Sequence, residues 1–426
     1  METFGCKVSR ADAARIERAL MGAGMRPAEA GAPAEVCVVC GCVVTGVAEG
    51  KSRRALARVA RENEGAVVVA AGCIAVRMGE KLDDDAAPVA KADIALEPDR
   101  IGCIVEELAR FDRFASLREP ENAPAARPAG FPGRTRALLK VQDGCDGSCS
   151  YCIVPRMRGA PRSRPVADVI EEAKRLLGAG HPELVLAGVR LGRYDGGGED
   201  VRLPALVERL LALTSHGLVR LRLSSIEPMD FDPALAELAA SSRVLCPHFH
   251  LPLQSADDGV LAAMRRPYDV KRYDEIVWRI RTSVPDAALT TDIIAGFPTE
   301  APEAHARSVA YIRRARFARL HAFPYSARPS TPAAGLDRVV DVNEARRRAK
   351  ELIAAGDEAA REYRAQFVGS VVEVIAEPGD APGRLAGYTD RYARVAFDGG
   401  AELAGTLVRV RAVEDVPHGF AGELVS

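Results

Sequence analysis

Short apolar runs alternate with amphipathic stretches along the first 115 residues of the chain. The runs 36–39 and 67–70 predict buried β-strands, and the stretches 11–23 and 51–62 have the spacing of amphipathic helices. This rhythm predicts a parallel sheet whose crossover helices cover its faces. Residues 116–133 contain four prolines and predict an extended linker.

From residue 134 the same rhythm returns with longer units. Six strand candidates, most of them separated by helical stretches, lie at 137–141, 183–187, 219–224, 246–251, 289–295 and 320–323. Such a series predicts a partial (β/α) barrel, a relative of the eight-unit form. A charged amphipathic helix at 342–366 closes this region. Apolar runs separated by Gly, Pro and Asp turns then predict a small all-β barrel, with strands at 368–375, 392–397 and 406–413.

The expected fold class is therefore α/β, in three domains. An N-terminal parallel-sheet domain spans 1–115, a partial (β/α)6 barrel spans 134–366 after the linker, and an all-β barrel spans 367–426. Of the 426 residues, 48% are hydrophobic and 27% are charged, which excludes disorder as the dominant state. No apolar run approaches a membrane span and no signal pattern opens the chain, so a cytoplasmic protein is expected. The net charge of −1 gives no global signature of nucleic-acid binding.

The cysteines carry the first chemical signal, because a chain without a secretion signal would keep them as thiols or metal ligands. Three of the ten form the pattern Cys145-x3-Cys149-x2-Cys152 on a loop after the first barrel strand. Thiolates are soft ligands suited to an iron–sulfur cluster, and three of them leave one iron open to another molecule. A closed zinc site would need a fourth ligand, and no other Cys or His lies nearby in the sequence. Three unligated thiols are the alternative.

This spacing resembles the signature of radical S-adenosylmethionine (SAM) enzymes, and the likeness to one branch of them, the methylthiotransferases, runs over nearly the whole chain. The resemblance implies that Cys145, Cys149 and Cys152 are catalytic. They would hold a 4Fe-4S cluster whose open iron binds SAM, which is then cleaved to a 5′-deoxyadenosyl radical. Tyr151 matches the family's aromatic position between the last two cysteines.

Three further segments resemble the N-terminal motifs of this family, namely Thr3-Phe-Gly-Cys6-Lys-Val, Val39-Cys-Gly-Cys42-Val-Val-Thr and Ala71-Gly-Cys73-Ile-Ala. The resemblance implies that Cys6, Cys42 and Cys73 hold a second 4Fe-4S cluster, which delivers sulfur, while a second SAM supplies the methyl group. From spacing alone, scattered buried thiols are the alternative. Cys37 is expected in the core, and Cys40 remains a possible substitute ligand for Cys42.

Three barrel motifs resemble the strand ends that bind SAM, namely Ala187-Gly-Val-Arg-Leu-Gly192, His250-Leu-Pro-Leu-Gln-Ser255 and Thr291-Asp-Ile-Ile-Ala-Gly-Phe-Pro-Thr-Glu300. They imply cofactor contacts from Gly188, Gln254, Asp292 and Gly296, in addition to Tyr151. Gly296 would allow close approach of the backbone. Strand and turn packing is the alternative for each. His248 and His250 alternate on one strand without a third ligand, which predicts a structural role.

Local charge predicts contact with RNA. Seven basic residues against two acidic ones lie between Arg134 and Arg164 and bracket the cysteine loop, where a phosphate backbone would have to lie. A second basic run at 313–319 is equally typical of a solvated helix face. The C-terminal barrel resembles the TRAM domain that the family uses on tRNA, but its five arginines against nine acidic residues predict a poor general RNA binder.

Finer likenesses indicate a substrate within the family. Gly5-Cys-Lys-Val, Leu251-Pro-Leu-Gln-Ser255 and His321-Ala-Phe-Pro-Tyr-Ser-Ala-Arg328 resemble the MtaB type, which modifies carbon 2 of N(6)-threonylcarbamoyladenosine next to the anticodon of tRNA. Lys7-Val8 stands where the isopentenyladenosine type has Gln-Met, and Gln254-Ser255 where the ribosomal-protein aspartate type has Gln-His.

The resemblance also implies partners, namely the tRNA anticodon loop and an electron donor such as flavodoxin or ferredoxin, with the chain acting as a monomer. Methylthiolation of isopentenyladenosine in tRNA, or of an aspartate in a ribosomal protein, is the alternative within the family. A non-catalytic iron–sulfur RNA-binding module and a radical SAM enzyme with one cluster are the rivals outside it.

Overall fold

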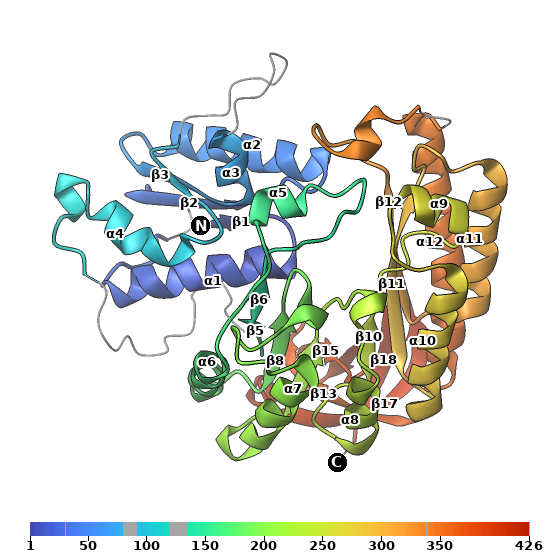
Figure 1. The fold of residues 1–426 in the computed structure, drawn as a ribbon. Coiled ribbons are helices and arrows are strands. Elements are labelled where there is room, and N and C mark those ends of the chain that lie inside the picture. The colour runs from blue at the N-terminus through green and yellow to red at the C-terminus, as the bar shows by residue number, and fades with distance from the viewer. Residues whose placement is uncertain (30, 80–91, 119–134, 338–339, 426) are drawn as a thin grey trace.

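The computed structural model describes residues 1–29, 31–79, 92–118, 135–337 and 340–425 (Figure 1). Its N-terminal part is a parallel sheet in the order β1 (Glu2–Thr3), β2 (Val36–Gly41), β3 (Val67–Gly72) and β4 (Ile94–Leu96). Helices α1 (Lys7–Gly22) and α4 (Ile104–Leu108) pack on one face, and α2 (Gly46–Glu62) and α3 (Cys73–Gly79) pack on the other. The predicted parallel sheet with crossover helices is confirmed.

The central strands of this sheet run two residues beyond the predicted apolar runs, and each ends on a glycine. Gly41 and Gly72 are paired partners at the strand ends. A Cβ at position 41 would lie 2.4 Å from the Ile74 side chain, so only glycine lets β2 continue beneath α3. Most of the predicted linker, from residue 119, lies outside the described residues.

The second part is a partial barrel of six parallel strands. One sheet contains β5 (Arg136–Lys140), β8 (Glu183–Ala187) and β9 (Arg220–Leu223), and the other contains β10 (His248–His250), β11 (Ala288–Ala295) and β12 (Arg319–Pro324). Bridges between β9 and β10, at Leu221–Leu245 and Ser225–His250, join the two sheets. The predicted partial barrel is confirmed.

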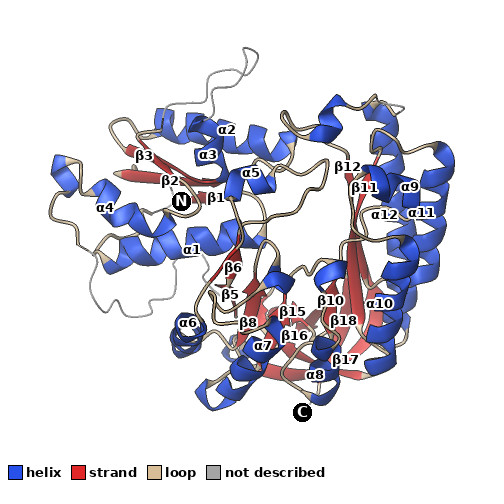
Figure 2. Ribbon diagram, viewed as in Figure 1, coloured by secondary structure: helices blue, strands red, loops and turns tan. Residues whose placement is uncertain are grey.

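Helices cover the outer face of these strands (Figure 2). They are α6 (Val166–Gly178), α7 (Leu203–Leu211), α8 (Ala234–Ser241), α10 (Val270–Ser283), α11 (Pro302–Ala315) and α12 (Val342–Ala365). Two short helices, α5 (Val154–Arg158) and α9 (Asp258–Ala263), and a small hairpin of β6 (Gln142–Asp143) with β7 (Arg162–Ser163) decorate the strand ends. Leu289, Ile293 and Leu320 pack with helix residues in one continuous core, so their alternate neighbours face the barrel interior. We call that interior face the lumen.

The fourth predicted barrel strand, at 246–251, is shorter in the structure. The ladder covers only His248–His250 because Pro247 and Pro252, on either side, have no backbone N–H to donate.

The C-terminal part is a curled six-stranded sheet in the order β13 (Val371–Ile375), β17 (Leu407–Val416), β18 (Gly419–Leu424), β16 (Arg394–Asp398), β15 (Arg384–Tyr388) and β14 (Glu377–Pro378). The sequence predicts three of these strands and misses β14, β15 and β18. Two of the missed strands contain glycines that resemble turn residues. In fact both glycines allow neighbouring strands to pack closely. A Cβ at Gly387 would lie 2.2 Å from the Ile375 carbonyl oxygen, and a Cβ at Gly422 would lie 2.4 Å from the Val410 side chain.

The turn between β15 and β16 of the C-terminal sheet closes one end of the partial (β/α) barrel. The Arg220 guanidinium donates to the carbonyl oxygens of Tyr388 and Glu373, both at 2.7 Å. The fully buried Arg222 donates to Asp390 and Thr389 oxygens at 2.7 and 3.0 Å, and to the Glu183 carboxylate at 2.8 Å. The alternating Arg-Leu pattern of β9 places both arginines on the lumen side, where they hold this turn.

None of the described helices combines the length and the apolar composition that a membrane span requires.

Replacing Arg222 should destabilise the barrel strongly. Arg222→Met leaves the buried Glu183 carboxylate and two carbonyl oxygens without a donor, and we expect the free energy of unfolding to fall by about 3–5 kcal/mol. Arg384→Met is the matched control, because it removes an exposed pair with Asp398 and should cost less than about 1 kcal/mol. Urea denaturation of the three proteins measures both values, and equal losses would contradict the role of Arg222.

Candidate active site

The cysteine triplet lies on the loop that connects β6 to α5. Gly144 starts this loop with a φ of +74° and packs so closely against the Ala160 carbonyl that no Cβ fits there. The backbone amide of Gly147 donates to the Cys145 Sγ at 3.2 Å, and that of Cys152 donates to the Cys149 carbonyl at 3.1 Å. These turns direct three thiols from one loop toward a common region.

Two residues far along the chain hold this loop against the barrel. The Arg266 guanidinium lies 3.1 Å from the Cys149 Sγ and 3.5 Å from the Tyr151 hydroxyl. It also pairs with the Glu227 carboxylate. Sequence reasoning missed Arg266 and Glu227, and no local pattern could have found them because only the barrel fold brings them to the loop.

The triplet thiols are protonated before a metal binds. Burial raises the pKa of Cys152 to about 12 and also raises that of Cys145, so an incoming metal has to displace their protons. Three thiols on one loop match the donor set of an iron–sulfur cluster with one open iron.

The three N-terminal cysteines meet at the carboxyl ends of the sheet. Cys6 is the N-cap of α1, Cys42 directly follows β2, and Cys73 directly follows β3. Gly5, with a φ of +110°, packs on Cys42, and a Cβ there would lie 3.0 Å from the Cys42 Sγ. The nearby Cys6 thiol contributes to raising the pKa of both Cys42 and Cys73, after burial, which is the main cause. The topology therefore places the three predicted ligands at one site.

Cys40 and Cys37 lie away from this group. Alternation along β2 directs the Cys40 side chain into the core beneath α1 and the Cys37 side chain into the core beneath α2. Burial raises the pKa of Cys40 to about 12. The arrangement favours Cys42 over Cys40 as the third ligand.

A buried ionic network joins the two cysteine groups. The Arg158 guanidinium pairs with Asp12 of α1 and with Asp143 of β6, both at 3.0 Å. Lys140 pairs with the same two carboxylates at 2.5 and 2.6 Å. Burial raises the pKa of Cys73 and the nearby Arg158 opposes that rise, so a single side chain at the end of α5, the helix that follows the triplet loop, also lies near the other site.

This network reduces the charge that the basic segment around the cysteine loop could offer to RNA, and the predicted contact with RNA there stays a prediction. Lys140 and Arg158 are neutralised by carboxylates, and Arg164 pairs with Glu172. Arg136 lies over the Tyr388 ring, 4.5 Å from its centroid. Arg134 lies outside the described residues. Internal ion pairs thus neutralise Lys140, Arg158 and Arg164, and a charge count along the chain cannot detect this.

The predicted SAM residues lie at the strand ends, but several make other contacts. Gly188 packs against Gln142, and Gln254 has a φ of +67° and forms a bridge to Ile293 of β11. The requirement for glycine at 296 comes from α12, since a Cβ there would lie 2.4 Å from the Ala345 Cβ. Packing against α12 therefore requires glycine at 296 in its own right, and the predicted approach of a ligand to this backbone stays a prediction.

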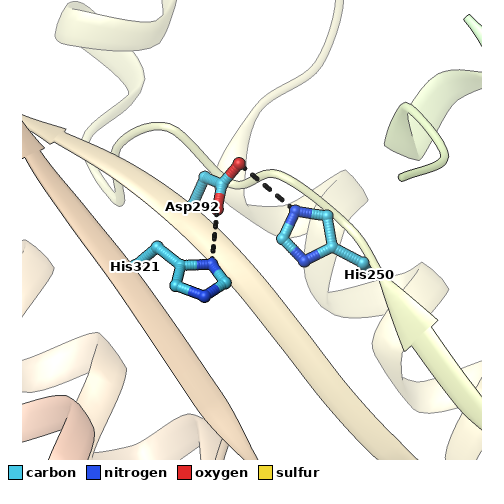
Figure 3. Close-up of side chains that lie close together, drawn as sticks. All are labelled: His250, Asp292 and His321. Carbon is cyan, nitrogen blue, oxygen red and sulfur yellow. Dashed lines mark hydrogen bonds and ion pairs between the residues drawn. The ribbon is translucent and has the colours of Figure 1, made fainter. Parts of the chain in front are cut away.

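Asp292 sits between two histidines in the lumen (Figure 3). Its two oxygens accept from the His250 Nε2 at 3.2 Å and the His321 Nδ1 at 3.1 Å. Burial alone would raise the pKa of Asp292, but the two hydrogen bonds outweigh it and hold that pKa below its usual range. Sequence reasoning treated His250 as lacking ligand-type partners, whereas the strand register supplies both, with ligand-type atoms of all three residues within 4.8 Å.

Further cations surround the Tyr392 ring at the closed end of the lumen. Arg222 lies 4.8 Å, Arg136 5.7 Å and the Lys7 ammonium 6.0 Å from its centroid. Burial would raise the pKa of Tyr392, but these three cations lower it overall. The ring also lies 5.0 Å from the ring of His248. The lumen is thus lined by charged, imidazole and phenol groups.

Comparisons with known proteins cover both halves of this site. The Radical SAM superfamily matches residues 139–312, and an uncharacterized protein family, UPF0004, matches residues 1–92. Threonylcarbamoyladenosine tRNA methylthiotransferase MtaB from Bacillus subtilis (strain 168) is 33% identical, over 97% of this chain and 93% of that protein. A tRNA-2-methylthio-N(6)-dimethylallyladenosine synthase from Anaeromyxobacter sp. (strain K) is 35% identical, over 100% and 93%.

Among solved structures, the radical SAM methyltransferase TsrM from Kitasatospora setae, with tryptophan substrate and a SAM analogue bound, has a TM-score of 0.47. It is 16% identical to this chain, over 88% of this chain and 71% of that one.

The ion pairs of Asp292 should make part of the stability depend on acid pH. Because the pKa of Asp292 is held below its usual range, the ionised carboxylate stabilises the fold above the ordinary aspartate pKa of about 3.9, and this contribution is lost as the pH falls through the lowered value. In urea denaturation at about pH 5, Asp292→Asn should be less stable than the parent, and this gap should close as the pH falls below about 4. A gap that widens in acid would contradict this assignment.

Proposed function

The chain belongs to the radical SAM tRNA methylthiotransferase family, and we propose that it adds a methylthio group to carbon 2 of N(6)-threonylcarbamoyladenosine beside the anticodon of tRNA. Enzymes of this family bind SAM and a 4Fe-4S cluster, and the methylthiotransferases carry a second cluster. Sequence identity does not select the nucleoside, because relatives named for the threonylcarbamoyl and for the dimethylallyl substrate are 33% and 35% identical.

The polar lumen is the observation that carries the proposal. The side chains that gather there, opposite the helix-covered face, are Arg136, Arg222, His248, His250, Asp292 and His321. A dimethylallyl group offers no hydrogen bonds, and burying it here would set an apolar group against charged and polar side chains with which it cannot pair. A threonylcarbamoyl group offers a carboxylate, a hydroxyl and a ureido group, each of which can pair with such side chains.

We assign the two cysteine groups different tasks. Cys145, Cys149 and Cys152 would hold the cluster that binds SAM, with Tyr151, Gly188, Gln254, Asp292 and Gly296 near the cofactor. Cys6, Cys42 and Cys73 would hold the second cluster. When bound, the first cluster supplies the electron that cleaves SAM and the second supplies the sulfur. Arg158 fixes the position of one group relative to the other, and Arg266 holds the loop of the first. The electron donor, flavodoxin or ferredoxin, and the monomeric state stay predictions.

Removing either cysteine group should halve the bound iron. We expect the triple Ala variants at 145/149/152 and at 6/42/73 each to hold roughly four irons per chain after anaerobic reconstitution, against roughly eight in the parent. Cys103→Ala is the matched control, since this half-buried cysteine belongs to neither group. Iron analysis with Mössbauer spectroscopy measures this. Full iron content in either triple variant would contradict the ligand assignment, and four irons in the parent would favour a one-cluster enzyme.

The substrate is tested by supplying the reconstituted enzyme with anticodon stem-loop RNAs that differ in one nucleoside. With SAM, sulfide and dithionite, the RNA that carries threonylcarbamoyladenosine should gain the methylthio group, and the RNA that carries isopentenyladenosine should not. Mass spectrometry of the nucleosides and of 5′-deoxyadenosine gives the result. Product on the isopentenyl RNA alone would overturn the substrate assignment, and bound iron without 5′-deoxyadenosine would indicate a non-catalytic protein.

A further inference from the structure

Lys7 projects from the N-terminal domain toward the lumen. It is the first residue of α1 and directly follows Cys6. Its ammonium faces the Tyr392 ring, and its other charged neighbours are Arg222, Asp292 and Arg136. A side chain that starts beside a cysteine of the sheet site therefore reaches the interior of the barrel.

Lys7 differs from the other lumen cations in having no anion of its own. Arg222 is paired with Glu183, and Arg136 has Glu377 at 3.9 Å. Asp292, the carboxylate near Lys7, is occupied by two histidines. No hydrogen bond or ion pair joins the Lys7 ammonium to any residue in the described part of the chain.

An ammonium in this position has an unmet electrostatic partner. Lys7 is half-buried beside the Tyr392 ring with two arginines among its neighbours, so an anion that reaches it would form a charge-assisted hydrogen bond. The lumen supplies no free carboxylate among the described residues. The natural partner is therefore an anionic group on a ligand that enters the lumen.

We propose that Lys7 binds the carboxylate of the threonylcarbamoyl group and thereby selects a carboxylate-bearing adenosine. This inference rests on the proposed function. In adenine the substituted amino group is on carbon 6, and carbons 6 and 2 flank the same ring nitrogen. A carboxylate held at Lys7, whose backbone adjoins Cys6, would therefore bring the modified base close to the site that Cys6 belongs to.

The test measures binding and turnover with a matched series of ligands. Anticodon stem-loops that carry threonylcarbamoyladenosine, its neutral methyl ester or isopentenyladenosine are titrated into the reconstituted enzyme, and anisotropy gives each Kd. We expect the parent to bind the acid roughly 10–100-fold more tightly than the ester, as one charge-assisted hydrogen bond allows. Lys7→Met should lose that preference and bind acid and ester alike, while Lys7→Arg should retain part of it. The Kd for the ester should not change.

Arg10→Met is the matched control, since Arg10 lies on the same helix and is exposed. It should bind all three RNAs as the parent does. Iron content is measured in every variant, because Lys7 adjoins Cys6, and Lys7→Gln replaces Lys7→Met if the latter holds less iron.

The outcomes separate this inference from the proposed function. A parent that does not distinguish acid from ester, or a Lys7→Met protein that keeps the full preference with its iron intact, overturns the role of Lys7. A parent that never methylthiolates the threonylcarbamoyl RNA overturns the proposed function instead.

Discussion

The buried charges between the N-terminal sheet and the barrel are the contacts on which the rest of the site depends. Asp12 belongs to the helix that Cys6 caps, and Arg158 and Asp143 flank the loop of the cysteine triplet. Their ion pairs therefore set the distance between two groups of thiols that belong to different domains. Because these charges are nearly out of contact with water, separating them would leave each uncompensated, so the two halves are held in one arrangement.

Much of this architecture follows from local patterns. Strand–helix alternation gave the parallel sheet and the partial barrel, and the cysteine spacing located the loop that carries the triplet. The prediction missed strands β15 and β18 for a physical reason. Gly387 and Gly422 allow close packing between strands, but in the sequence alone they resemble turn residues. Likewise, the cations near the cysteine loop looked free because their partners, Asp12 and Glu172, lie on other elements.

The polar lining of the lumen could not be predicted from the sequence, because it depends on how neighbouring strands are aligned in the barrel. His250, Asp292 and His321 come from three strands, and only their pairing brings two imidazoles to one carboxylate. Lys7 and Tyr392 are 385 positions apart in the sequence, and the packing of the N-terminal sheet, the partial barrel and the C-terminal sheet makes them neighbours. Residues that look like isolated polar interruptions of apolar strands are in this way assembled into one polar interior.

The turn between β15 and β16 also links the C-terminal sheet to the other two parts of the fold. Tyr392 sits in that turn with a φ of +64° and touches cations from the N-terminal domain and from the barrel. The C-terminal sheet thus closes the lumen from one end instead of packing only on the outside of the barrel. A movement of this sheet would displace the Tyr392 ring and, with it, the cations from two other parts of the chain that surround it.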